Sequence, residues 1–237
     1  MEYKSIKELQ YNHLGEDIYV ICAGPSSNFI EPSFFEYKTV IGVNNVFKKF
    51  SCNYVIAKDL KEHPRFTRMV DELKHTNIPL IFPEYHTAHY SDGKNEPYYS
   101  NGYMFEHLDN KSADMDEEVF SVIGTDKLVV SRSTVTSAIN LAAYMGARNI
   151  ILVGHDCGTI DGDLYDPTYT EPDWGSANNY SSAPKWVGSI ETQTLKVKER
   201  VKEEYGSNVY SLNPFINFGL EGHRYTSNSR DEDGKLR

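Results

Sequence analysis

The stretch Asp17-Ile-Tyr-Val-Ile-Cys-Ala-Gly-Pro-Ser-Ser27 decides the fold that we expect for this chain. Its first half is an apolar run rich in β-branched residues, which predicts a buried strand. Gly24 ends this run and allows a sharp turn and the close approach of a ligand, and Pro25 suits the first position of a predicted helix. Ser26 and Ser27 can donate hydrogen bonds beside the first N–H groups of this helix, which lack partners within it. Such a corner is either a phosphate site or an ordinary turn from strand to helix. The dinucleotide-binding pattern G-x-G-x-x-G is absent.

Two further predicted strands end in polar residues. Thr39–Val43 precedes Asn44, and Tyr54–Ala57 precedes Lys58 and Asp59. The carboxyl ends of parallel strands meet at one edge of a sheet, and open α/β sheets bind their ligands at that edge. We therefore expect these polar residues at a ligand-binding edge.

Strands and helices alternate along the chain, which predicts an α/β fold with a parallel sheet and right-handed crossovers. The other predicted strands lie at 79–82, 127–130, 149–153 and 208–211, and the predicted helices at 64–76, 138–146 and 190–205. A length of 237 residues fits one domain. We assign residues 1–226 to this domain, with lid insertions near 84–118 and 159–189 where polar and aromatic residues break the alternation, and we expect a disordered tail at 227–237.

The strand predicted at Asn149–Val153 is followed by Gly154, His155 and Asp156. A carboxylate at the tip of a central strand is costly to leave unpaired. Asp156 is therefore either hydrogen-bonded to neighbouring backbone or recruited by a ligand. A second candidate edge group is the hydroxyl-rich start of the helix predicted near 138–146, since hydroxyls both cap a helix N-terminus and can contact a ligand.

Composition excludes several classes of function. The formal net charge of −10 argues against non-specific binding to nucleic acid or to an anionic membrane. No segment approaches the roughly 18 apolar residues that a membrane span needs, and no signal peptide is evident, so we expect a soluble cytoplasmic protein. The three cysteines are far apart and form neither a disulfide framework nor a thiolate zinc site. His86 and His89 lack a completing ligand, so no metal site is predicted.

Several short motifs stand in a fixed order. They are Ile21-Cys-Ala-Gly-Pro-Ser26, Val43-Asn44, Ser133-Thr134, the segment from Gly146 to Asp156, and Tyr165. Together they resemble a superfamily that contains the bacterial lipooligosaccharide sialyltransferases, the motility-associated glycosyltransferases and the 6-hydroxymethylpterin diphosphokinase-like proteins. The resemblance extends from about residue 17 to about residue 215. It implies a single Rossmann-like domain with a mostly parallel sheet flanked by helices.

In the sialyltransferases these motifs hold the cytidine monophosphate part of the donor without a required metal. The resemblance therefore implies nucleotide binding by Gly24, Pro25, Ser26, Asn44, Ser133 and Thr134, and we add Ser27 and Asp59 from their positions after predicted strands. Tyr165 matches one of two Tyr residues that stabilise the leaving phosphate there.

The resemblance is incomplete at the reacting groups. The position of the second Tyr of the sialyltransferases falls near Gly158, and the position of the His that deprotonates the acceptor falls near Ser189. This chain therefore departs from the sialyltransferase pattern at both positions. For the general base, Asp156 is the best placed residue, and His155, His86 and His89 are the alternatives.

The main hypothesis is a nucleotide-sugar-dependent glycosyltransferase of surface glycan synthesis, with a CMP-activated donor, a glycan or small-molecule acceptor and no required cofactor. The alternative is a diphosphokinase, which needs Mg²⁺ and charged residues around a triphosphate; Lys58, Asp59, Asp156, Asp161 and Asp163 are candidates. The missing His motivates a third hypothesis, a non-catalytic nucleotide-binding relative. The sequence leaves a homo-oligomer open.

Overall fold

The computed structural model describes residues 3–58, 60, 64–85, 94–95, 97, 99–107, 127–131, 133–157 and 183–212. Its strands are β1 (Lys4–Ser5), β2 (Asp17–Ile21), β3 (Thr39–Val43), β4 (Tyr54–Ile56), β5 (Leu80–Pro83), β6 (Gly102–His107), β7 (Lys127–Leu128), β8 (Asn149–Val153) and β9 (Asn208–Ser211). Its α-helices are α1 (Pro64–Leu73), α2 (Thr134–Tyr144) and α3 (Ala183–Tyr205). Short 3₁₀ helices are η1 (Ile6–Leu9), η2 (Pro25–Phe29), η3 (Pro32–Phe35) and η4 (Asn44–Lys48).

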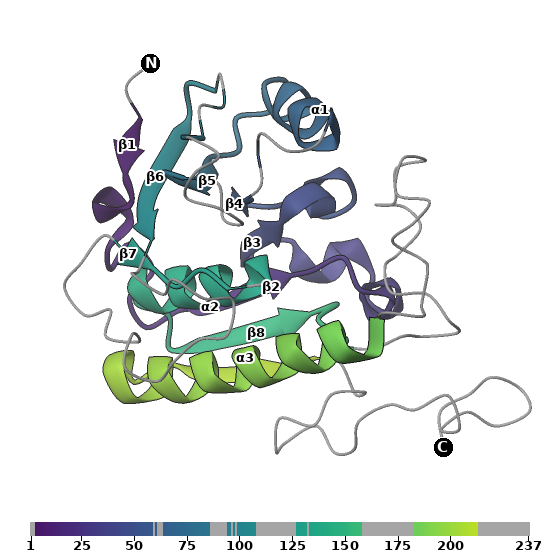
Figure 1. Cartoon of the computed structure of the whole chain (residues 1–237), viewed down its shortest axis with the longest axis vertical. Coiled ribbons are helices and arrows are strands. Elements are labelled where there is room, and N and C mark those ends of the chain that lie inside the picture. Colours follow the sequence, from purple (N-terminus) through teal and green to yellow (C-terminus); the bar gives the residue numbers. More distant parts are fainter. Residues whose placement is uncertain are drawn as a thin grey trace, which may run out of the picture.

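The strands form one nine-stranded sheet in the order β1-β6-β5-β4-β3-β2-β8-β9, with β7 paired to β6. Every pairing between these strands is parallel (Figure 1). The predicted α/β class with a mostly parallel sheet is therefore confirmed. Parallel strands need crossover connections, which explains why strands and helices alternate along the sequence.

The sequence prediction missed two strands, β1 and β6. β6 lies inside the range 84–118 that was predicted as an insertion, and it pairs with β5 within the sheet. Helix α3 begins at Ala183 rather than at Ile190, so it starts inside the second predicted insertion, 159–189. Neither range is therefore an insertion throughout. Most of their remaining residues, and all of the predicted tail 227–237, lie outside the described residues.

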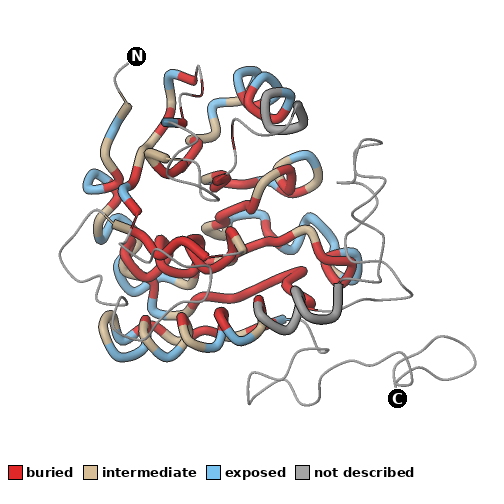
Figure 2. The backbone as a smooth tube through the Cα atoms, viewed as in Figure 1, coloured by how far each residue is buried: buried red, intermediate tan, exposed pale blue. Residues whose placement is uncertain are grey.

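The sheet separates two apolar cores because side chains alternate along each strand. In β2, Ile18 and Val20 join the core formed with α2 and α3, whereas Ile21 joins the core on the opposite face. That second core contains Phe35 of η3 and Met69 of α1. Figure 2 shows the resulting continuous burial along the central strands. Both faces of the sheet are covered, as all-parallel sheets require.

Helix α2 is buried along its whole length. It packs against α3 and against β2, β3 and β8. Two of its side chains also hold the backbone after β7: Asn140 Oδ1 accepts a hydrogen bond from Val129 N at 2.9 Å, and Ser137 Oγ donates to Val129 O at 2.5 Å. These bonds satisfy both backbone groups of Val129 and fix the residues that lead into α2.

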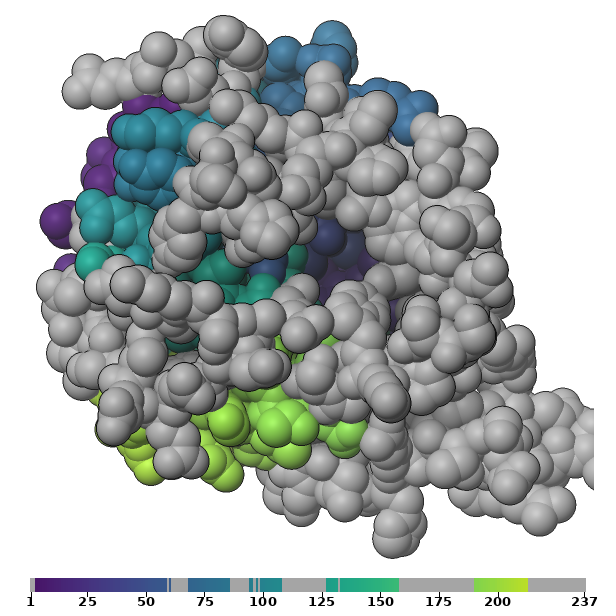
Figure 3. Space-filling view, in the orientation of Figure 1, coloured from purple at the N-terminus to yellow at the C-terminus, as the bar shows by residue number. Residues whose placement is uncertain are grey.

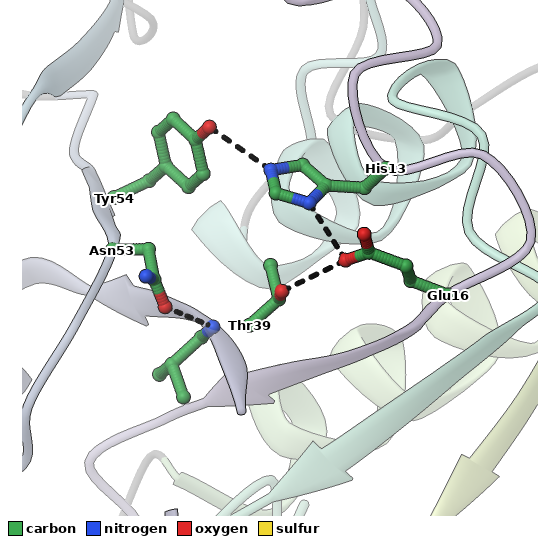
Figure 4. A network of polar contacts seen from close by, with 6 residues as sticks. His13, Glu16, Thr39, Asn53 and Tyr54 are labelled. Atoms are coloured by element: carbon green, nitrogen blue, oxygen red, sulfur yellow. Dashed lines mark hydrogen bonds and ion pairs between the residues drawn. The ribbon is translucent and has the colours of Figure 1, made fainter. Parts of the chain in front are cut away.

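The amino-terminal ends of the strands carry a separate polar network (Figure 4). Glu16 Oε2 lies 2.8 Å from His13 Nδ1 and accepts a hydrogen bond from Thr39 Oγ1 at 3.0 Å. His13 Nε2 lies 3.0 Å from the Tyr54 hydroxyl. Hydrogen bonds from His13 and Thr39 lower the pKa of Glu16. The network ties the loop before β2 to the starts of β3 and β4.

Candidate nucleotide site

The order of the strands defines one point at which the chain reverses direction across the sheet. From β2 the chain adds β3, β4, β5 and β6 on one side, and it later adds β8 and β9 on the other. Ligands of open α/β sheets bind at the carboxyl ends of the strands beside such a point. The segments Gly24–Ser27 and Gly154–Cys157 follow the two strands that meet there, β2 and β8.

Gly24 is required at this corner for a steric reason. We expected it to allow a sharp turn and the approach of a ligand, but its φ of −69° is open to any residue. A Cβ at Gly24 would instead lie 2.3 Å from Gly154 O and 2.7 Å from Asp156 Oδ2. The group that approaches Gly24 in the structure is therefore the tip of β8. Pro25 takes the first position of η2, as predicted.

Asp156 contacts the corner directly. Its Oδ2 accepts a hydrogen bond from Ser26 N at 2.9 Å, and its Oδ1 accepts one from Ser26 Oγ. Both residues are buried. Burial raises the pKa of Asp156 from 3.8 to about 6, although the two bonds from Ser26 act in the opposite direction. Of the two roles considered for Asp156, the structure shows a bond to neighbouring backbone.

The first N–H groups of the corner have acceptors within the protein. Ser26 N donates to Asp156, and Ser27 N donates to Gly24 O at 3.1 Å. These are the groups that a phosphate was expected to use. The Ser27 hydroxyl differs from them, since it is fully buried and has no hydrogen-bond partner among the described residues.

Asn44 follows β3 in a strained conformation. Its φ of +56° is in the left-handed region, which is uncommon for a residue other than glycine and is concentrated at functional sites. Within the described part of the chain, the buried Oδ1 atoms of Asn44 and Asn45 have no hydrogen-bond partner. Two amide oxygens that can accept hydrogen bonds thus stand next to the carboxyl end of β3, the neighbour of β2.

The start of α2 presents hydroxyls and a buried cation. Ser133 is the N-cap, and its Oγ accepts a hydrogen bond from Val135 N at 3.3 Å. Thr134 is nine-tenths buried. Lys58, only 2% exposed, donates a hydrogen bond from Nζ to the Ser131 carbonyl. A buried ammonium beside a helix N-terminus favours a bound anion.

Lys58 was expected at the ligand-binding edge because it directly follows a buried strand, but it was given a chemical role only in the diphosphokinase hypothesis. Asn95 went unnoticed; its Nδ2 donates to Lys58 O at 3.1 Å and to Pro83 O at 2.9 Å, and its Oδ1 has no partner among the described residues.

His155 points toward α3. Its Nε2 lies 2.8 Å from Thr194 Oγ1 and 3.3 Å from Cys157 Sγ. Thr194 Oγ1 donates its own proton to Ile190 O at 3.0 Å, so the Nε2 of His155 carries the hydrogen of this contact. Burial lowers the pKa of His155 from 6.5 to about 4, which keeps the imidazole neutral at pH 7.

The site therefore joins the end of β2, the end of β3, the start of α2 and the tip of β8. In Figure 3 the dark purple and blue atoms of the N-terminal part of the chain lie beside teal-green atoms of the region that contains α2, near the middle of this face. Asp59 and Tyr165 lie outside the described residues, as do His86, His89, Asp161 and Asp163.

The described residues contain no group of three or more His, Cys, Asp or Glu side chains that could hold a metal ion. None of their helices combines the length and apolar character that crossing a bilayer requires.

No family model and no curated protein matches this sequence. The fold is shared with the MAf glycosyltransferase from Magnetospirillum magneticum AMB-1, at a TM-score of 0.53 and 14% identity over 89% of this chain and 35% of that one. It is also shared with a variant of the sialyltransferase CST-II in complex with CMP, at a TM-score of 0.52 and 14% identity over 89% of this chain and 86% of that one. The chain spans about a third of the first protein's length. The resemblance inferred from the motifs is thus confirmed at the level of the fold.

Proposed function

We propose that this protein is a glycosyltransferase that takes a nucleotide-activated sugar, with CMP as the first nucleotide to test, and that it serves surface glycan synthesis. One observation carries the proposal. This fold is shared with a CMP-bound sialyltransferase. Near the point at which its strand order reverses, Ser27 Oγ and Asn44 Oδ1 are buried and lack partners among the described residues. Buried polar groups are normally hydrogen-bonded, so these two atoms mark a place for a ligand.

The chemistry of the edge suits the parts of a nucleotide. Amide oxygens such as those of Asn44 and Asn45 accept hydrogen bonds from ribose hydroxyls or from the amino group of a base. The start of α2, with the ammonium of Lys58 beside it, suits the phosphate. In this proposal Ser133 and Thr134 line the phosphate end of the donor, and Gly24, Pro25 and Ser26 shape the nucleoside end.

The transfer step requires two further groups. The acceptor hydroxyl oxygen attacks the anomeric carbon, the bond from that carbon to the phosphate oxygen breaks, and a base takes the hydroxyl proton. We assign the leaving phosphate to Tyr165 on the resemblance of the sequence. His155 and Asp156 both bond within the protein, so their geometry favours neither as the base. No observation favours the diphosphokinase hypothesis, and Mg²⁺ has no place in the proposed reaction.

Calorimetric titration with CMP, UMP, AMP and GMP, each with and without EDTA, tests the donor site. We expect CMP to bind in EDTA and Asn44→Gly to weaken it by about tenfold or more, because glycine keeps the left-handed backbone but removes the amide. Tyr37→Gly is the matched control, since Tyr37 has a φ of +65° and is fully exposed. Binding of none of the four nucleotides contradicts the proposal. CMP binding without turnover of any CMP-activated sugar identifies a non-catalytic relative.

A further inference from the structure

We propose that Asp156 is the resident anion of the Gly24–Ser27 corner: it positions this corner for the nucleoside of the donor and directs the donor phosphate elsewhere. The inference rests on the proposed function and makes it more specific. It assigns Asp156 a positioning role in place of the base role expected from its place after β8.

The hydrogen bonds give the first argument. A helix start offers backbone N–H groups to an anion, and at η2 the Asp156 carboxylate already accepts from Ser26 N at 2.9 Å. Its second oxygen accepts from the hydroxyl of the same residue. A phosphate at this corner would have to displace the carboxylate or sit beside a buried negative charge. Both are unfavourable, since like charges in a buried site repel strongly.

Packing gives the second argument. Gly24 N donates to Gly154 O at 2.8 Å, and Cys22 N donates to Val153 O at 2.7 Å. A Cβ on Gly154 would lie 2.4 Å from Cys22 O, as a Cβ on Gly24 would lie 2.3 Å from Gly154 O. The backbones of the two segments are thus in direct contact, and no ligand atom fits between them. The donor reaches the corner from the side of Ser27 and Asn44, whose side-chain oxygens have no partner among the described residues and suit hydroxyl and amino groups.

A neutral part of the donor is therefore expected at the corner. The phosphate is left to the start of α2, where Lys58 provides the positive charge. We call the two hydrogen bonds between Asp156 and Ser26 the brace of the corner. In this arrangement the brace and the phosphate site are separate, and their contributions to affinity can be measured separately.

The experiment compares cytidine and CMP binding by calorimetry in the wild type, Asp156→Asn and Asp17→Asn. Asp17 is the matched control because its carboxylate also joins β2 to β8, through Asn149 Nδ2 at 2.7 Å, but at the opposite edge of the sheet. We expect Asp156→Asn to weaken cytidine and CMP by the same factor, about tenfold, and Asp17→Asn to change neither. Tighter CMP binding with unchanged cytidine binding in Asp156→Asn would place the phosphate at the corner and overturn the inference.

The pH dependence supplies a second readout. Cys22 interacts electrostatically with Asp156, and His155 and Cys157, its neighbours in the sequence, are the other titratable groups beside it among the described residues. His155, with a pKa of about 4, stays neutral above pH 5, and burial raises the pKa of Cys22 well above 9. Asp156, with a pKa of about 6, gains a proton on acidification and loses acceptor capacity toward Ser26. Cytidine affinity should fall from pH 7 to pH 5 in the wild type and stay level in Asp156→Asn; a parallel fall in both contradicts the inference.

Hydrogen exchange of the unliganded protein separates this inference from the proposed function. Peptides covering residues 22–29 should exchange faster in Asp156→Asn than in the wild type or Asp17→Asn, and Ser26→Ala should show a smaller change. If the wild type binds neither cytidine nor CMP but this pattern holds, the donor proposal fails while the brace stands. Unchanged exchange in Asp156→Asn refutes the brace, whatever the nucleotide results.

Discussion

His155 and Asp156 are consecutive residues that bond in different directions: His155 Nε2 lies 2.8 Å from Thr194 on α3, and Asp156 accepts two hydrogen bonds from Ser26 after β2. Burial favours the neutral form of each side chain, lowering the pKa of His155 to about 4 and raising that of Asp156 to about 6. Their effects on the pH dependence of stability are opposite, because one is a base and the other an acid.

Asp156→Asn should reveal the contribution of His155. Between pH 4 and pH 6.5 the unfolded His155 binds a proton that the folded residue does not, so the free energy of unfolding rises with pH in this window. The total rise is about 3 kcal/mol at most, at 1.36 kcal/mol per pKa unit. Urea unfolding at pH 4.5, 5.5, 6.5 and 7.5 measures it. A stability that does not change with pH in Asp156→Asn would show that His155 is solvated.

His155→Gln should show the opposite slope. The folded Asp156 holds its proton up to about pH 6, whereas the unfolded residue loses it near pH 3.8. The contribution of Asp156 to the free energy of unfolding is therefore greatest below pH 3.8 and is lost as the pH rises through 6. Glutamine retains a side-chain N–H that can bond to Thr194. The same series of urea unfolding measurements applies. The free energy of unfolding of the wild type should depend less on pH than that of either variant, because the contributions of His155 and Asp156 oppose each other.

Gly24→Ala should destabilise the protein by about 3 kcal/mol or more, since the added methyl meets the Gly154 carbonyl and the Asp156 carboxylate. Gly15→Ala is the comparison: nothing lies within 4 Å of its Cβ position, but its φ is +79°. That variant should cost about 1 kcal/mol from backbone strain alone. Chemical denaturation of both variants checks this, and equal costs would show that the corner adapts to a side chain.

Glu16→Gln should destabilise the protein only slightly, by less than about 1 kcal/mol, because Glu16 is half exposed and water screens its contacts with His13 and Thr39. The pKa of Glu16 is lowered in the folded state, so its contribution is present above the unfolded pKa and is lost on acidification. Thermal unfolding in 0.05 M and 1 M NaCl checks this, with the difference from the wild type expected to shrink at high salt. A difference independent of salt would contradict an electrostatic origin.

The strands that the sequence predicted best are those buried on both faces. β2, β3 and β8 are apolar runs, and their pattern identifies them without knowledge of their neighbours. β6 was missed because the sequence Gly102-Tyr-Met-Phe-Glu-His107 is flanked by polar and aromatic residues and alternates only weakly between buried and exposed positions. β1 has two residues and is a strand only by virtue of its pairing with β6.

The candidate site was predictable in its residues but not in its contacts. The corner, Asn44, the hydroxyls before α2 and Asp156 all stood out as polar groups after apolar strands. The bond between Asp156 and Ser26 joins positions 130 residues apart, and no local pattern encodes it. The left-handed backbone of Asn44 likewise depends on the tertiary fold, which holds a strained residue in place.

The position of β2 between β3 and β8 governs the order in which the nascent chain can fold. β2 pairs with β3 as soon as both have been synthesised, but its other neighbour, β8, follows about 130 residues later. Until then one edge of β2 is open, and open strand edges promote association between chains. The Gly24 corner also lacks Gly154 and Asp156 during this time, so the ribosome must translate most of the domain before the proposed nucleotide site can form.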